Sequence, residues 1–242
     1  MRRETQNILL VLLGGALLKM SFTGTYLRYV KPSHQWLLVA AGAVMILLAA
    51  VSIVRELRGE TDLDGHGDHA HAARSAWLLI LPVLAVFLVA PPALGSDSVG
   101  RAAGNRSAPP AASSTEGHGS ALFPALPAGD PIALPLSEFS SRAAWDRAHS
   151  LDERTARLTG FVVQEGDDTY VARLAIACCA ADAFPVKIEL RGRELSNLPD
   201  DSWVEVLARL RPGTATRANE YVPAVSVQAV RSIPEPEDPY EH

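Results

Sequence analysis

The chain has 242 residues, of which 48% are hydrophobic and 20% are charged, and its formal net charge is −5 at pH 7. A net negative charge speaks against nucleic acid as a partner, because nucleic-acid binding requires a basic surface. Much of the apolar content lies in residues 1–95. This distribution predicts a membrane region followed by a soluble region.

Three apolar segments within residues 1–95 are each long enough to cross a membrane as a helix. Residues 35–54 and 75–94 carry no charge, and residues 7–27 carry only Lys19. About 20 apolar residues span a hydrocarbon core of about 30 Å, and a lysine near the end of a span can extend to the head groups. We predict three transmembrane helices in a multi-pass cell-membrane protein. No small-residue cleavage site follows the first, so it is expected to be an uncleaved anchor.

The basic residues beside these segments predict their orientation. One side carries five arginines, namely Arg2, Arg3, Arg55, Arg58 and Arg74. The loop on the other side carries Arg28 and Lys31. Basic residues accumulate on the cytoplasmic side of a membrane. We therefore predict a cytoplasmic N-terminus and, after three crossings, an extracytoplasmic C-terminal domain.

A histidine-rich loop, residues 60–74, separates the second and third predicted spans. His66, His69 and His71 lie within six residues, together with Asp62, Asp64 and Asp68. Imidazole and carboxylate groups at this density can hold zinc or a related metal. The alternative is a polar connector without a ligand.

Residues 96–130 predict a disordered linker. Of these 35 residues, 24 are Ala, Ser, Gly, Pro or Thr, a composition that cannot bury a core. Residues 131–242 then form a soluble β domain. It is expected to begin with a short strand at 132–136 and a helix over 137–149 that Ser137 caps.

Short alternating apolar runs predict five strands after that helix. They are expected at residues 155–163, 169–179, 185–191, 202–210 and 221–233. Five strands with a longer connection between the third and fourth fit an OB-like barrel with one helix, and a β-sandwich is the alternative. OB-like folds often bind nucleic acid, but residues 131–242 hold 12 Lys and Arg against 18 Asp and Glu, so that function is excluded here.

Cys178 and Cys179 are the only cysteines and stand side by side. Adjacent residues of a strand point to opposite faces, so both cysteines could be small core residues. Three chemical alternatives remain: a strained vicinal disulfide, a soft-metal site that includes Asp182, and an intermolecular disulfide. A metal site would need a further ligand, from His149, a second chain or a partner. The spacing alone does not separate these alternatives.

The ending "PEPEDPYEH" has three prolines in nine residues, which favours an extended and exposed segment. We predict that it docks on a partner through five residues: Pro234, Pro236, Asp238, Pro239 and Tyr240. The sequence holds no phosphate-binding glycine loop, nucleophile elbow or zinc-protease helix. We therefore do not expect an enzyme.

The segments "ARLAIACCAADAFPVKIEL", "DSWVEVLARL" and "PEPEDPYEH", together with the three spans, resemble the YcgQ-like family of permease subunits. The resemblance covers most of the chain and implies association with a multi-span permease, with a link to metal, zinc among them, for some members. Here the tail ends in Glu241-His242, and the histidine-rich loop is not carried over from the family.

Two hypotheses of different class follow. The first is an accessory permease subunit whose β domain docks on the transporter or captures a solute. The alternative is a stand-alone metal- or redox-sensing membrane protein that uses Cys178 and Cys179. An enzyme with a vicinal-thiol reaction is less favoured, because Asp182 is the only candidate base nearby.

Overall fold

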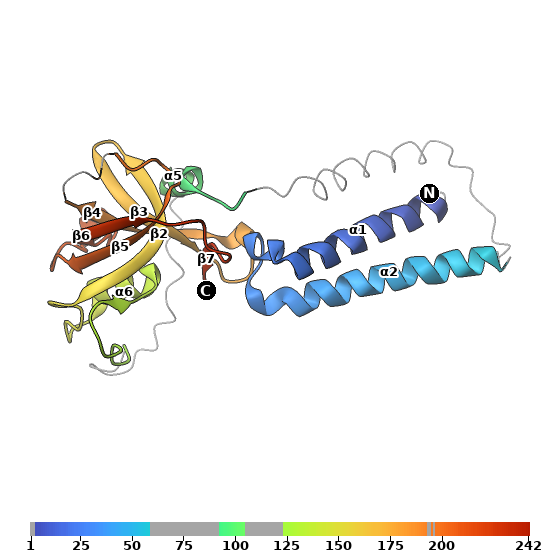
Figure 1. Ribbon diagram of the computed structural model, residues 1–242, viewed down its shortest axis with the longest axis horizontal. Coiled ribbons are helices and arrows are strands. Elements are labelled where there is room, and N and C mark those ends of the chain that lie inside the picture. Colours follow the sequence, from blue (N-terminus) through green and yellow to red (C-terminus); the bar gives the residue numbers. More distant parts are fainter. Residues whose placement is uncertain (1–2, 59–91, 105–122, 193–194, 196) are drawn as a thin grey trace. The chain divides into compact units, whose positions relative to one another are not determined.

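The computed structural model describes residues 3–58, 92–104, 123–192, 195 and 197–242 (Figure 1). The chain divides into two compact units, Met1–Ala93 and Leu94–His242. The described part of the first unit is helical. The second unit holds a seven-stranded sheet together with helices α5 and α6.

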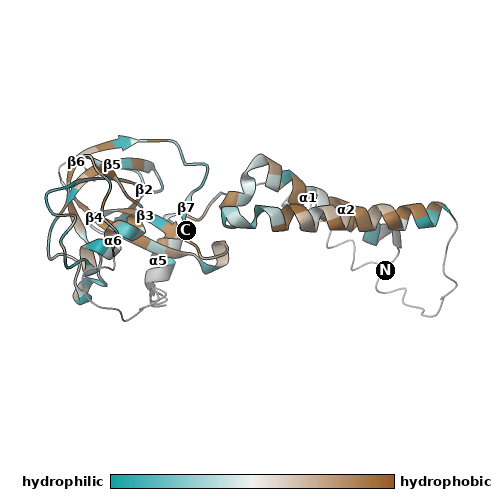
Figure 2. Cartoon of the chain, turned by 90° about the horizontal axis from the view of Figure 1, so that it is seen from below, coloured by the Kyte–Doolittle hydropathy of each residue, from teal (hydrophilic) through white to brown (hydrophobic). Residues whose placement is uncertain are grey.

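Two long apolar helices form the N-terminal unit. Helix α1 (Arg3–Thr23) and helix α2 (Gln35–Leu57) are joined by two short 3-10 turns, η1 (Thr25–Arg28) and η2 (Pro32–His34). Figure 2 shows that hydrophobic residues follow both helices along most of their length. The stretches Gln6–Thr23 and Pro32–Leu57, with mean hydropathies of 1.4 and 2.8, are long and apolar enough to cross a membrane.

The remaining membrane-region predictions lie outside the described residues. Most of the third predicted span, residues 75–94, belongs to the undescribed range 59–91. The histidine-rich loop with His66, His69 and His71 lies in the same range. Those predictions therefore stay predictions.

Helices α1 and α2 pack closely where two glycines meet. A Cβ atom built on Gly14 would lie 2.9 Å from the carbonyl oxygen of Gly42, and one on Gly42 would lie 2.9 Å from Leu18. Glycine is therefore what lets the two backbones approach, a kind of close packing that also occurs between membrane helices. At the loop end, the side chain of Gln35 donates a hydrogen bond to the backbone oxygen of Ser21 (3.1 Å).

The C-terminal unit is a mainly-β domain. Its strands are β1 (Ile132–Ala133), β2 (Thr155–Glu165), β3 (Asp168–Ala175), β4 (Phe184–Arg191), β5 (Trp203–Leu210), β6 (Ala224–Ser232) and β7 (Tyr240–Glu241). They are ordered β1-β2-β5-β6-β4-β3-β7, and β2 also pairs with β3. Strands β4 and β6 are parallel, as are the short pairs β1–β2 and β3–β7.

The alternating patterns predicted the long strands well. In β5, the side chains of Val204, Val206 and Ala208 are fully buried, as the pattern of that segment predicts. The prediction was wrong about β3, which ends at Ala175 rather than at Cys179. It also missed the two-residue strand β7, because pairing with β3 and not local propensity makes that segment a strand.

Helix α6 (Leu136–Trp145) packs its apolar face into the core, with Leu136 and Phe139 buried. It begins one residue before the predicted start, and Ser137 is not its N-cap. Pro135 holds that position without a side-chain cap. The carboxylate of Glu241 accepts hydrogen bonds from the backbone N–H groups of Leu136 (2.6 Å) and Ser137 (2.9 Å) instead.

The predicted linker is wrong at its start, because Ser96–Gly104 forms helix α5. The N–H and hydroxyl of Ser96 both donate to the carboxylate of Asp201, at 2.6 and 2.9 Å. Val99 is 1% exposed and so belongs to the core. Distant contacts thus order a segment whose composition alone predicts disorder. Residues 105–122 of the predicted linker lie outside the described range.

Candidate metal site

Cys178 and Cys179 lie on the connection between β3 and β4. Strand β3 ends at Ala175, a 3-10 turn η3 covers Ala180–Asp182, and β4 begins at Phe184. Because β3 and β4 are antiparallel neighbours, this connection is the tip of a hairpin. Cys178 and Asp182 are exposed there, and Cys179 is half-buried.

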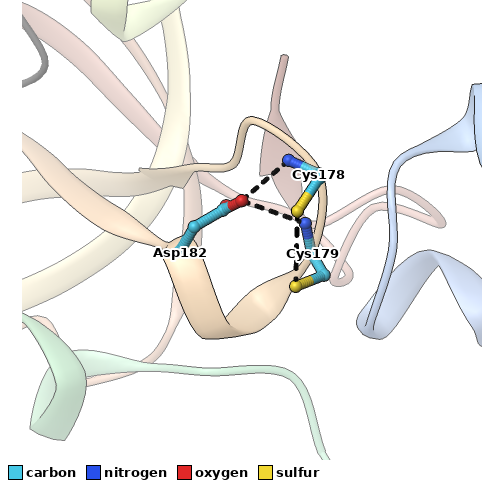
Figure 3. A group of neighbouring side chains, drawn as sticks. All are labelled: Cys178, Cys179 and Asp182. Carbon is cyan, nitrogen blue, oxygen red and sulfur yellow. Dashed lines mark hydrogen bonds between the residues drawn. The ribbon is translucent and has the colours of Figure 1, made fainter.

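Asp182 organises the turn by accepting backbone hydrogen bonds (Figure 3). One carboxylate oxygen accepts from the N–H of Ala177 (2.9 Å), and the other accepts from the N–H groups of Cys178 (2.9 Å) and Cys179 (3.4 Å). Cys179 is the N-cap of η3 and forms a reciprocal capping box with Asp182. Asp182 therefore fixes the backbone that carries both thiols.

The two sulfur atoms lie on the same side of the turn, 3.6 Å apart. This corrects the expectation of opposite faces, which assumed that the cysteines continue β3. Both cysteines are free thiols, since a disulfide would bring the sulfurs to about 2.05 Å. Two sulfurs each about 2.3 Å from a tetrahedral zinc ion would lie about 3.8 Å apart. The observed separation is thus close to that of two ligands of one zinc ion.

The electrostatics of the turn keep the Cys178 thiol protonated at neutral pH. A hydrogen bond to the Asp182 carboxylate, followed by one to Cys179, raises the pKa of the Cys178 thiol to about 12. The same bond from Cys178 lowers the pKa of Asp182. At neutral pH Cys178 therefore keeps its proton, and a protonated thiol is a poor nucleophile. A metal ion can bind this sulfur by displacing that proton.

The donor atoms of Cys178, Cys179 and Asp182 all lie within 4.8 Å of one another. Two sulfurs and one carboxylate oxygen suit zinc or another soft divalent metal. The sequence predicted these three residues together, and the structure brings them together. It does not add His149, whose side chain lies beside Asp152 at 4.0 Å and is 72% exposed.

The tail was predicted to be exposed, and this is wrong for its last part. Pro239, Tyr240 and Glu241 are buried against their own domain, while Pro234 is exposed and Pro236 and Asp238 are intermediate. The reason is a set of contacts from Arg173, which donates hydrogen bonds to the backbone oxygens of Asp238 (2.6 Å) and Pro239 (3.3 Å). Burial lowers the pKa of Arg173.

The tail also supports the strand that leads to the cysteines. Tyr240 pairs with Leu174 in the sheet, and the N–H of Ile176 donates to the backbone oxygen of Glu241 (2.9 Å). Ile176 stands two residues before Cys178. Sequence reasoning missed Glu241 as a functional support, because a buried glutamate near a chain end carries no local signal of its partner.

The sequence matches family models over most of its length. Residues 5–105 match the DUF1980 N-terminal domain, and residues 146–242 match the DUF1980 C-terminal domain. The chain belongs to the DUF1980 family. This agrees with the YcgQ-like resemblance of its sequence. In the DUF1980 protein described here, the cysteine turn lies within the C-terminal family domain.

The other comparisons add no functional argument for this DUF1980 protein. No curated protein matches it. One solved structure, described as an aspartyl-tRNA synthetase from Leishmania major Friedlin, is 11% identical with a TM-score of 0.27. The match covers 47% of this chain and 22% of that one. A likeness at this level carries no inference about fold or activity.

Proposed function

We propose that this DUF1980 protein is an accessory subunit of a membrane permease, and that its C-terminal domain captures a soft divalent metal outside the cytoplasm. The observation that carries the proposal is the group formed by Cys178, Cys179 and Asp182, whose donor atoms lie within 4.8 Å of one another on an exposed turn. This is a binding and assembly role. The permease partner itself rests on the YcgQ-like resemblance.

The character of α1 and α2 supports the membrane part of the proposal. Their exposed large side chains are apolar along most of both helices, for example Val11, Val44, Leu47, Leu48 and Val51. Exposed apolar surface on this scale suits lipid or a neighbouring membrane helix rather than water. Near the loop end, Phe22 and Trp36 are each 75% exposed, and aromatic residues favour the membrane interface.

The orientation follows from charge and from the number of crossings. Arg55 and Arg58 lie at the end of α2 that is remote from Trp36, so that end is assigned to the cytoplasm. With the third span over residues 75–94, the domain that begins at Leu94 emerges on the opposite side. The cysteine turn then faces the extracytoplasmic space.

We further propose that the C-terminal domain is an OB-like barrel. Strand β2 pairs with β5 on one side and β3 on the other, and β6 and β4 link those two strands. The parallel pair β4–β6 among otherwise antiparallel long strands supports the same assignment. Strands β1 and β7 are additions to this ring.

Metal content of the full chain in detergent tests the proposal. We expect about one zinc per chain at the turn, measured by elemental analysis after dialysis against micromolar zinc. A background variant H66A/H69A/H71A removes the histidine-rich loop as a second source of ligands. Adding C178S/C179S to this background should lower the bound zinc at least tenfold, because the sulfurs are the soft ligands.

A matched control is Asp167→Asn, which removes an exposed carboxylate from the β2–β3 turn. Its zinc content should equal that of the background variant. Equal zinc in the double cysteine variant would overturn the metal function. Purification from native membranes in mild detergent tests the other half, and recovery of the chain without a multi-span partner would count against the permease role.

A redox sensor is the second candidate, favoured by two free thiols with sulfurs 3.6 Å apart. A two-electron oxidant would join them in a vicinal disulfide with loss of both thiol protons. Intact mass after mild oxidation decides between the candidates. If the oxidised chain is about 2 Da lighter and its cysteines cannot be alkylated, the disulfide has formed. If both thiols can still be alkylated, the metal function is favoured.

A further inference from the structure

The cysteine turn offers a metal fewer ligands than a closed site requires. Structural zinc sites hold four protein ligands, whereas sites that take up another group keep one position open. Among the described residues the group has three members, Cys178, Cys179 and Asp182. In the same part of the chain, His149 lies beside Asp152 and His242 is paired with Asp238 (2.7 Å).

Asp182, the third residue of the group, already accepts hydrogen bonds from the backbone of the turn. Asp182 accepts from the N–H groups of Ala177, Cys178 and Cys179, so it contributes to a metal only through its remaining lone pairs. The exposed Cys178 and half-buried Cys179 lie at a hairpin tip, where a second macromolecule can approach. The site is therefore incomplete and open on the side of its strongest ligands.

We propose, resting on the metal function above, that a cysteine thiolate of a partner protein completes this site and that the turn passes its metal on by thiolate exchange. Two sulfur ligands already select a soft metal, and a third sulfur matches that preference better than a carboxylate or water. The partner's sulfur bonds to the metal as its thiol releases a proton. The bonds to Cys178 and Cys179 then break as one sulfur takes up that proton and the other takes up a proton from solvent. No electrons move.

Charge favours a different partner over a second copy of this chain. Two copies sharing one zinc would gather four thiolates and two Asp182 carboxylates around a single divalent ion. The domain is also acidic throughout, with 12 Lys and Arg against 18 Asp and Glu in residues 131–242. Like charges brought together at a contact oppose association. A single incoming thiolate adds one negative charge only.

The test uses the full-length H66A/H69A/H71A chain in detergent, loaded with zinc, and glutathione as the probe. Zinc X-ray absorption counts the sulfur ligands. We expect two sulfurs in the loaded chain and three after glutathione is added. S-methylglutathione, which has no thiol, should leave the count at two. Transfer of zinc to a colorimetric chelator should be at least tenfold faster with glutathione than with the methylated control.

Three outcomes separate the two proposals. Absence of stoichiometric zinc before any thiol is added overturns the metal function itself. Four sulfurs with one zinc for every two chains overturns only the partner, because a second copy then closes the site. A count that stays at two with glutathione, or equal transfer rates with both probes, overturns the thiolate exchange while the metal function stands.

Discussion

Asp182 shows how one carboxylate sets the chemistry of its neighbours. It holds the turn through three backbone hydrogen bonds and raises the pKa of Cys178 to about 12. The carboxylate stabilises the protonated thiol mainly by accepting its hydrogen bond, and it would also repel a thiolate. The group therefore combines a positioned sulfur with low reactivity at neutral pH.

Asp182→Asn should lower the pKa of Cys178 toward the ordinary thiol value and so raise its thiolate fraction. Only the thiolate reacts with iodoacetamide, so alkylation of Cys178 at pH 8 should accelerate at least tenfold. Tandem mass spectrometry of the peptide that contains Cys178 and Cys179 measures the rate at each. Asp167→Asn is the control, and an equal rate in both variants would contradict the role given to Asp182.

Glu241 is a second residue whose effect reaches beyond its own element. Its carboxylate accepts two N–H groups at the start of α6, and it is 7% exposed. Glu241→Ala should destabilise the domain by about 1–3 kcal/mol, because it leaves buried helix N–H groups without an acceptor. Denaturant unfolding measures this, and the exposed Glu237→Ala should change the midpoint little. Similar midpoints for the two variants would refute the capping role.

At the scale of elements, helix α1 provides a matched pair of glycines, of which only Gly14 meets α2. A Cβ atom on Gly14 would lie 2.9 Å from a backbone oxygen, whereas one on Gly15 meets nothing within 4 Å. Gly14→Ala should therefore force the helices apart and lower the thermal unfolding midpoint in detergent by several degrees. Gly15→Ala should leave it nearly unchanged. If both substitutions shift the midpoint alike, this crossing is not what holds the hairpin.

The sequence predicted the elements whose hydrophobic pattern lies within their own residues. The alternation in residues 202–210 predicts β5, and 20 uncharged residues predict the apolar run of α2. Helix α5 and strand β7 could not be predicted this way, because Ser96 depends on Asp201 and Tyr240 depends on Leu174. In both contacts the two residues lie far apart in the sequence, at a separation that no sequence rule predicts.

The candidate site was predictable in its membership but not in its geometry. Two adjacent cysteines and an aspartate three residues later form a short motif, and short motifs keep their members close. The direction of the thiols depends on where β3 ends, which is a matter of sheet pairing. Once β3 ends at Ala175, the strand rule of opposite faces no longer applies to Cys178 and Cys179.

At the scale of the whole molecule, labelling of the two cysteines tests the proposed extracytoplasmic position of the β domain. A membrane-impermeant maleimide at mildly alkaline pH should label Cys178 or Cys179 in intact cells, because the proposed topology puts the turn outside. They are the only thiols in the chain, so C178S/C179S must abolish labelling. If labelling occurs only after the cells are lysed, the β domain lies in the cytoplasm and the proposed topology is wrong.

The contacts of β7 have a consequence for how the domain is made. Strand β7 follows every other described strand in the sequence, yet it pairs with β3, caps α6 through Glu241 and accepts the N–H of Leu94 at the Tyr240 hydroxyl. Chains emerge from the ribosome N-terminus first. Until Tyr240 and Glu241 emerge, α6 lacks its cap and β3 an edge partner. The domain therefore completes its fold only after Tyr240 and Glu241 have been synthesised, and a chain truncated before Tyr240 should be degraded faster than the full chain.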